Sequence, residues 1–209
     1  MREYTVHEET TANGYRLEIH PDTDGESPRH WSVAGVVVDW SRSYDIGDRK
    51  PTDEEKTALR YGGWEGLKRH LARQLGARVV LPISMLDHSG ITIWIGAGPH
   101  WSDSAGWDSG AVGFTYDTPE FVRECFGDGA SDAEIEATLR VDVETLDQFL
   151  RGDVYGYTLV NPANGETVES VWGFYGLDEC LEEARVIAAG LPGLADKETL
   201  ERVLEEAMS

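Results

Sequence analysis

The sequence predicts a single domain of the α+β class, in which helices pack against one mostly antiparallel sheet. Short runs of β-branched and aromatic residues bounded by turn residues indicate strands, and longer runs with apolar residues at helical spacing indicate helices. The two kinds of segment do not alternate regularly, as they do in a doubly wound parallel sheet. Since no internal repeat or linker interrupts the 209 residues, we expect one domain over residues 1–209.

The chain is expected to begin with a hairpin over about residues 3–20. Its strands, 3–8 and 14–20, are joined by Asn13-Gly14, a dipeptide that accepts the positive φ angles of a tight turn. The next apolar run, Trp31 to Trp40, is rich in β-branched residues, which favour a buried strand. Its length also suits a helix, so both assignments stay open.

Two capping boxes mark the starts of the longer helices. In Thr52–Glu55 and Ser131–Glu134, a hydroxyl and a glutamate three residues later satisfy free backbone amides. We expect the first helix to divide at Gly62-Gly63 and to end at Gly76, and the second to end at Gly152. The remaining elements are expected as strands at 78–84, 91–95, 111–116, 153–160 and 167–175, a short helix from Thr118-Pro119, and an appendage of two helices at about 177–189 and 196–207.

Charge limits the classes of partner. The chain has 39 acidic and 18 basic residues, a formal net charge of −21, which opposes direct binding to nucleic acid or to anionic membranes and favours a basic partner. Lysine occurs only at positions 50, 56, 68 and 197. An acid-rich, lysine-poor composition also suits solubility in high salt, so the acidity has two explanations.

No segment indicates a membrane or secretory protein. The N-terminal residues lack the apolar stretch of a signal peptide, and no later run approaches the ~20 apolar residues that span a bilayer. We therefore expect a cytoplasmic protein, in the cytosol of a host cell. Cys125 and Cys180 lie in expected helices without metal-ligand spacing and are interpreted as buried thiols.

The sequence predicts no cofactor and no metal. Gly96-Ala-Gly98 lacks the third glycine and the helix of a dinucleotide loop, and no Gly-Lys-Ser/Thr occurs. Asp22–Glu26 is similar to the start of a calcium loop, but Val33 stands where a bidentate glutamate is needed. The histidines at 7, 20, 30, 70 and 100 are scattered and are interpreted as surface or hydrogen-bonded side chains.

Short segments in a fixed order along the chain carry a resemblance. They are Ser27-Pro-Arg-His-Trp31, Tyr44-Asp-Ile-Gly-Asp48, Leu81-Pro, Leu86-Asp-His-Ser-Gly-Ile91, Trp107-Asp-Ser-Gly110 with Val112-Gly-Phe114, Gly152-Asp-Val-Tyr-Gly156 and Val171-Trp-Gly-Phe-Tyr-Gly176. These segments resemble an uncharacterised family of small accessory proteins from phages, integrative conjugative elements and related mobile DNA. The resemblance implies a genetic context and no activity, cofactor or catalytic residue. This chain departs from the pattern at Asp39-Trp40, where relatives tend to carry Cys-Phe-His, in a longer loop over 96–107, and in its C-terminal helices.

Four polar turns at expected strand ends are the candidate site. If these strand ends are neighbours, His88 can lie between a carboxylate and a serine hydroxyl, the components of acid–base or nucleophilic chemistry. The alternative is structural, because Asp and Ser in such turns bond their own backbone amides, and aromatic residues in strands are often packing. The candidate binding residues are Asp87, His88, Ser89, Trp107, Asp108, Ser109, Asp153, Tyr155, Trp172 and Tyr175, of which Asp87, His88, Asp108, Asp153 and Tyr155 would be catalytic in an enzyme.

Three functional hypotheses follow. The first is an acidic mobile-element protein that binds a host protein, in the manner of an inhibitor that imitates nucleic acid before a host defence nuclease (anti-restriction or anti-CRISPR type). The second is a small hydrolase or transferase, and the third is a structural or assembly factor. Under the first hypothesis, an acidic row on the long helix imitates phosphates and comprises Asp132, Glu134, Glu136, Asp142, Glu144 and Asp147.

Overall fold

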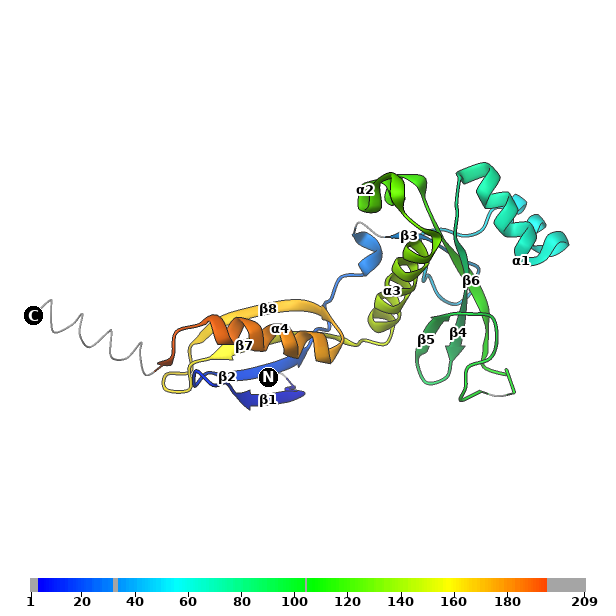
Figure 1. Cartoon of the computed structure of the whole chain (residues 1–209). Coiled ribbons are helices and arrows are strands. Elements are labelled where there is room, and N and C mark those ends of the chain that lie inside the picture. The colour runs from blue at the N-terminus through cyan, green and yellow to red at the C-terminus, as the bar shows by residue number, and fades with distance from the viewer. Residues whose placement is uncertain (1–3, 32–33, 104, 195–209) are drawn as a thin grey trace, which may run out of the picture. The chain divides into compact units, whose positions relative to one another are not determined.

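The computed structural model in Figure 1 describes residues 4–31, 34–103 and 105–194. It confirms the α+β class, but its strands form two four-stranded antiparallel sheets where the sequence predicted one. Contacts divide the chain into two compact units, Met1–Glu26 with Gly152–Ser209, here the terminal unit, and Ser27–Arg151, the central unit. The expected helix at 196–207 lies outside the described residues.

The terminal unit is a sheet with one helix. The sheet has the order β1-β2-β7-β8, and each strand is antiparallel to its neighbours. The predicted N-terminal hairpin is confirmed, although its first strand begins four residues later than expected, and Gly14 takes a φ of 91° in the turn. Its elements are β1 (His7–Thr10), β2 (Arg16–Pro21), β7 (Val154–Val160), β8 (Thr167–Tyr175) and α4 (Leu177–Gly190).

Small side chains let α4 pack closely on this sheet. The thiol of Cys180 and the methyl groups of Ala184 and Ala188 contact a buried row of larger apolar residues from β2 and β7. Burial raises the pKa of Cys180 to about 12, so this thiol is a packing group. Cys125 is exposed, and the prediction of a buried thiol is wrong there because it lies on the outer face of a short surface helix.

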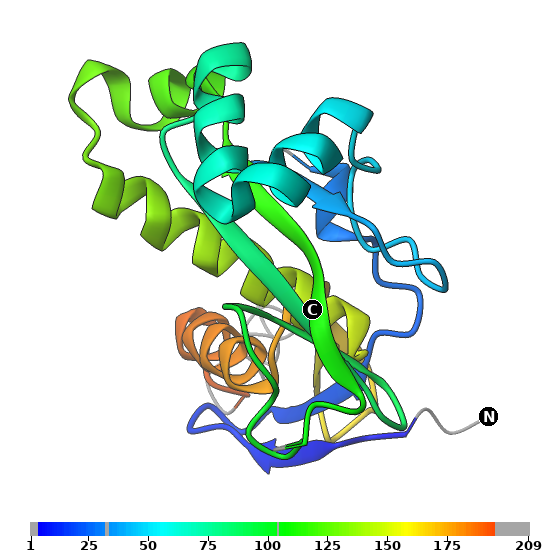
Figure 2. The same ribbon diagram turned by 90° about the vertical axis from the view of Figure 1, so that its right-hand side faces the viewer.

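The central unit has a sheet covered by helices on both faces (Figures 1 and 2). The sheet order is β3-β6-β4-β5, again with antiparallel neighbours. One face packs on α1 through Val38, and the opposite face packs on α3 through Val37. Its elements are η1 (Pro28–His30), β3 (Gly35–Asp39), α1 (Asp53–Leu75), β4 (Val80–Asp87), β5 (Ile91–Ile95), β6 (Ser109–Asp117), α2 (Pro119–Phe126), η2 (Gly127–Gly129) and α3 (Asp132–Leu150).

The open assignment of the run 31–40 is resolved in its second half, where Gly35–Asp39 form strand β3. Gly35 allows this strand to lie close to its neighbours. A Cβ atom at this position would clash with Leu139 and with the Tyr116 carbonyl oxygen, so only glycine fits. Val37 and Val38 are fully buried on opposite faces, as in a central strand. The β-branched composition therefore decided the assignment, and tertiary pairing with β6 fixed its extent.

Both predicted capping boxes are present, and α1 divides as predicted. Thr52 and Ser131 accept from the amides of Glu55 and Glu134, whose side chains bond back. Gly63 interrupts α1 with a φ of 59°, a left-handed conformation that favours glycine. The two segments of α1 thus meet at an angle, visible in cyan in Figure 2.

Arg29 joins three parts of the central unit. Its Nη1 donates to Asp142 of α3 at 2.6 Å, and its Nε donates to Asp48 at 2.9 Å. Its Nη2 donates to the Gly35 carbonyl oxygen of β3 at 2.7 Å. With the guanidinium side chain only 7% exposed, this network fixes η1, β3 and α3 together.

A surface ion pair holds α4 to β1 in the terminal unit. Arg185 donates to Glu9 from Nε at 2.8 Å and from Nη2 at 2.6 Å, and this lowers the pKa of Glu9 from 4.5 to about 2. A depressed folded pKa gives stability above pH 4.5 that is lost as the pH falls towards 2. We expect Glu9→Gln to lower the free energy of unfolding at pH 7 by at most about 1 kcal/mol, and to have no effect near pH 2.

Urea denaturation at the two pH values measures this difference. Glu8→Gln is the matched control, because Glu8 is the preceding residue on β1 and is exposed. An equal loss from the two variants at pH 7 would contradict a specific contribution of the Glu9 pair.

Candidate functional site

Two of the predicted polar turns lie side by side at one end of the central sheet. The turn 88–90 joins β4 to β5, and the loop 96–108 leads from β5 to β6. Because β6 is antiparallel to β4, Ser109 pairs with Leu86, and the Asp87 amide donates to the Asp108 carbonyl oxygen at 2.9 Å. The structure therefore brings the turn of His88 next to that of Asp108.

These residues form an exposed acid–histidine pair. His88 Nδ1 lies 3.2 Å from Asp108 Oδ2, with the two side chains 72% and 49% exposed. The Tyr44 hydroxyl donates to Asp87 at 3.0 Å, and this hydrogen bond raises the pKa of Tyr44. Ser89 takes a φ of 57°, which completes the turn before Gly90. The cluster is solvent-accessible, without the burial that tunes a catalytic base.

The serine hydroxyl of this cluster is not aligned for nucleophilic chemistry. Ser109 Oγ donates to Asp103 Oδ2 at 2.7 Å, where a nucleophile would donate to the histidine. Asp153 and Tyr155, the other members of the predicted catalytic set, belong to the terminal unit. The contacts within the central unit therefore give no support for the hydrolase hypothesis.

Asp103 organises the described part of the loop 96–108, residues 96–103 and 105–108. Its carboxylate accepts from the amides of Trp107 and Asp108 at 3.1 and 2.9 Å, in addition to the Ser109 hydroxyl. These bonds, with the Ser109 hydroxyl first, lower the pKa of Asp103. The loop so held exposes Trp101 and Trp107, each 87% accessible. Large exposed indoles on a constrained loop are typical of interaction surfaces.

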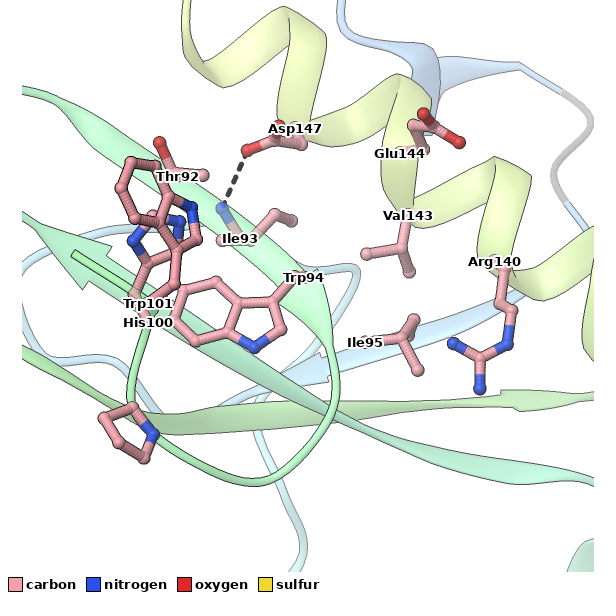
Figure 3. A pocket seen from close by; sticks show the side chains of 11 residues that line it. Thr92, Ile93, Trp94, Ile95, His100, Trp101, Arg140, Val143, Glu144 and Asp147 are labelled. Carbon is pink, nitrogen blue, oxygen red and sulfur yellow. Dashed lines mark hydrogen bonds between the residues drawn. The ribbon is translucent and has the colours of Figure 1, made fainter. Parts of the chain in front are cut away.

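A cavity of about 570 Å³ opens between the edge strand β5 and α3 (Figure 3). Its aromatic wall is a series of three rings, in which His100 lies 5.2 Å from both Trp94 and Trp101 between ring centroids. The facing wall comes from α3 and includes Arg140 and Glu144. An aromatic wall facing charged groups suits a side chain with an apolar stem and a polar end.

The edge of β5 is closed by α3 within this cavity. Asp147 Oδ1 accepts from the Ile93 amide at 2.7 Å, the dashed contact in Figure 3. The other carboxylate oxygen, Oδ2, lies 3.0 Å from Arg151 Nε. An edge amide occupied in this way does not pair with a foreign strand, so Asp147 opposes strand addition at Ile93.

The predicted acidic row on α3 is largely engaged within the chain. Glu144 is the exception, since it is exposed and has no partner among the described residues. The others are bound as follows: Asp132 by Arg78 at 2.5 Å, Glu134 by its capping box, Glu136 by Arg140 at 2.7 Å, Asp142 by Arg29, and Asp147 by Ile93 and Arg151. The sequence did not reveal these partners, so the row does not present free carboxylates in the way that was expected.

Of the three aromatic candidates in the terminal unit, Tyr155 and Tyr175 pack into its core, and Trp172 is 42% exposed on its sheet. Tyr175 is buried, and its hydroxyl donates to the Glu26 carbonyl oxygen. Tyr155 packs against the core below α4. Trp172 lies across Gly156 and stacks near His20, with 6.1 Å between ring centroids. These positions fit the packing alternative.

Sequence reasoning missed several groups that the structure places at distinctive positions. His20 is only 5% exposed, so it is not a surface side chain. Its Nε2 lies 3.4 Å from the Thr158 hydroxyl, as expected of a hydrogen-bonded histidine, whereas its Nδ1 has no hydrogen-bond partner within the described residues. Trp94, His100 and Trp101 form the aromatic wall. The tryptophan at 101 within a Gly-rich loop was a usable signal, because indoles are rare in solvated loops.

Comparison with protein-family models, curated proteins and solved structures found no match to this chain. Among the described residues, no helix is both long and apolar enough to cross a membrane. The same part of the chain contains no group of three or more His, Cys, Asp or Glu residues placed to hold a metal ion.

We expect Asp103→Ala to release the loop 96–108. Removing a carboxylate that accepts three hydrogen bonds should raise the exchange rates of the Trp107 and Asp108 amides about tenfold, since each bond contributes on the order of 1 kcal/mol. Hydrogen exchange followed by NMR measures this. Asp108→Ala is the control, because its side chain contacts His88 and not the loop amides; equal acceleration in both variants would argue against an organising role for Asp103.

Proposed function

We propose that the chain is an acidic binding protein that docks on a basic host protein through the loop 96–108. The observation that carries the proposal is the pair of indoles, Trp101 and Trp107, each 87% exposed on a loop fastened by Asp103. Tryptophan is among the residues that contribute most to binding free energy at protein interfaces, and an ordered loop loses little entropy on binding.

The surroundings of the loop favour a basic partner. Asp108 follows Trp107 directly, Asp87 bonds the Asp108 backbone, and Glu144 lines the same cavity as Trp101. With a net charge of −21, the whole chain attracts cationic surfaces over a distance set by the ionic strength. The aromatic cavity suits an arginine or lysine side chain of that partner, whose charge would lie near Trp94.

The finer proposal is an inhibitor of a nucleic-acid-targeting defence enzyme, as the mobile-element resemblance of the sequence suggests. An acidic face that imitates phosphates would lie on α4 in place of α3. This helix carries four exposed carboxylates that have no partners among the described residues, namely Asp178, Glu179, Glu182 and Glu183. They belong to a terminal unit whose sequence contains 19 acidic and 5 basic residues.

Pull-down of the tagged protein from host lysate, with quantitative mass spectrometry, tests the proposal. The wild-type chain should retain one basic protein at low salt, and Trp101→Ala with Trp107→Ala should reduce that recovery by about tenfold or more. Tyr4→Ala is the control, because Tyr4 is 75% exposed on the terminal unit. Unchanged recovery by the tryptophan variant would reject the docking surface, and self-association abolished by it would identify an assembly factor instead.

The same assay separates imitation of nucleic acid from general acidity. Glu179, Glu182 and Glu183 changed together to Gln should weaken retention more than the same change at Glu54, Glu120 and Glu124, which are exposed on the central unit. Equal weakening by the two sets would show that only net charge matters. An affinity for the retained protein that does not change with salt concentration would exclude imitation of phosphates.

A further inference from the structure

Cations are scarce in this chain, and most of them are paired. Of the 18 Lys and Arg residues, 15 lie in the described ranges, and ten of these form an ion pair. In a protein with about two acids for each base, an unpaired cation is therefore unusual. The five side chains without an ion pair among the described residues are Arg42, Arg60, Arg69, Arg73 and Arg123.

Three of these five arginines lie on α1 around its bend. Arg69 and Arg73 are one helical turn apart and so project from the same face of the second segment. The first segment carries Arg60, whose guanidinium lies 5.5 Å from the centre of the Tyr61 ring. Glu65, on the same segment, pairs with Lys68, and no ion pair joins a carboxylate of the described residues to Arg69 or Arg73.

The bend shapes a hollow beside these cations. A Cβ atom on Gly66 would come 2.6 Å from the Ala58 carbonyl oxygen, so glycine lets the two segments of α1 approach closely. The hollow in this angle measures about 430 Å³. Its walls include Tyr61 from the first segment and Arg69, His70, Arg73 and Gln74 from the second.

The donors in this hollow match a phosphate group. Arginine forks present paired N–H groups to tetrahedral oxyanions, and Gln74 adds neutral donors. Arginines at i and i+4 repel each other, a cost that an anion between them removes. Tyr61, 79% exposed at the rim, supplies an aromatic face on which a flat ring can stack.

We propose that the bend of α1 binds a nucleotide, with the phosphate held by Arg69 and Arg73 and the base stacked on Tyr61. This site is independent of the docking loop, which lies at the turn end of the central sheet. It uses no glycine-rich phosphate loop, because the arginine side chains replace the backbone amides of such a loop. A long nucleic acid is a poor occupant, since the net charge of −21 repels each further phosphate.

Isothermal titration with AMP, inorganic phosphate and a single-stranded oligonucleotide tests the site on the full chain. AMP should bind, and Arg69→Gln with Arg73→Gln should weaken it about tenfold or more, the effect of losing charge-assisted hydrogen bonds. The matched control is Arg42→Gln with Arg123→Gln, which removes two other unpaired arginines and changes the net charge equally. Equal weakening by both variants would overturn the proposal.

Tyr61→Ala provides a second test that does not alter charge. It should lower the affinity for AMP towards that for inorganic phosphate and leave phosphate binding unchanged. Absence of AMP binding to the wild-type chain, or tighter binding of the oligonucleotide with a steep salt dependence, would overturn the nucleotide assignment. Trp101→Ala with Trp107→Ala should bind AMP normally, so failure of the docking proposal and failure of this one are distinguishable.

Discussion

The pairing of a few cations with carboxylates, in which at least one side chain of each pair is buried, is the constraint on which the central unit depends. Arg29 is the main case, because one guanidinium satisfies Asp48, Asp142 and the Gly35 carbonyl oxygen from three segments. Removing one partner from such a network leaves a buried charge, which costs several kcal/mol. Arg49 repeats the arrangement by binding both oxygens of the buried Glu55 at the start of α1.

This constraint also positions the candidate site. Asp142 fixes α3 through Arg29, and Asp147, later on the same helix, closes the edge of β5 by accepting from Ile93. The aromatic cavity is the space left between these two elements. Asp103 then holds the loop that places Trp101 at its mouth. Carboxylates that appear in the sequence as surplus charge thus act as internal acceptors.

Local features of the fold were predictable because their causes are local. The capping boxes at Thr52 and Ser131, the break at Gly63 and the hairpin turn at Gly14 depend on residues within a few positions of each other. The division into two sheets was not predictable, because β2 pairs with β7, which lies more than 130 positions later in the chain. No local pattern reports such a pairing.

The same distinction explains what was missed at the site. The sequence indicated that the turns of His88 and Asp108 were polar strand ends, and strand pairing places them together. It could not show that Asp142 on α3 accepts a hydrogen bond from Arg29, 113 positions away. The prediction of a row of free carboxylates on α3 was therefore wrong at this residue. The arginines of α1 form no recognisable motif, because they stand out only by having no ion pair with a carboxylate in the described part of the chain.

NMR of arginine side chains, selectively labelled with ¹⁵N, tests most directly which arginines are paired with carboxylates. The Nε–H proton of Arg29, which is buried and hydrogen-bonded to Asp48, should exchange slowly with water. Those of Arg69 and Arg73 should exchange rapidly, because they have no ion pair among the described residues. Rapid exchange at Arg29, or protection of Arg69 and Arg73 in the ligand-free chain, would contradict the proposed distribution of paired and unpaired cations.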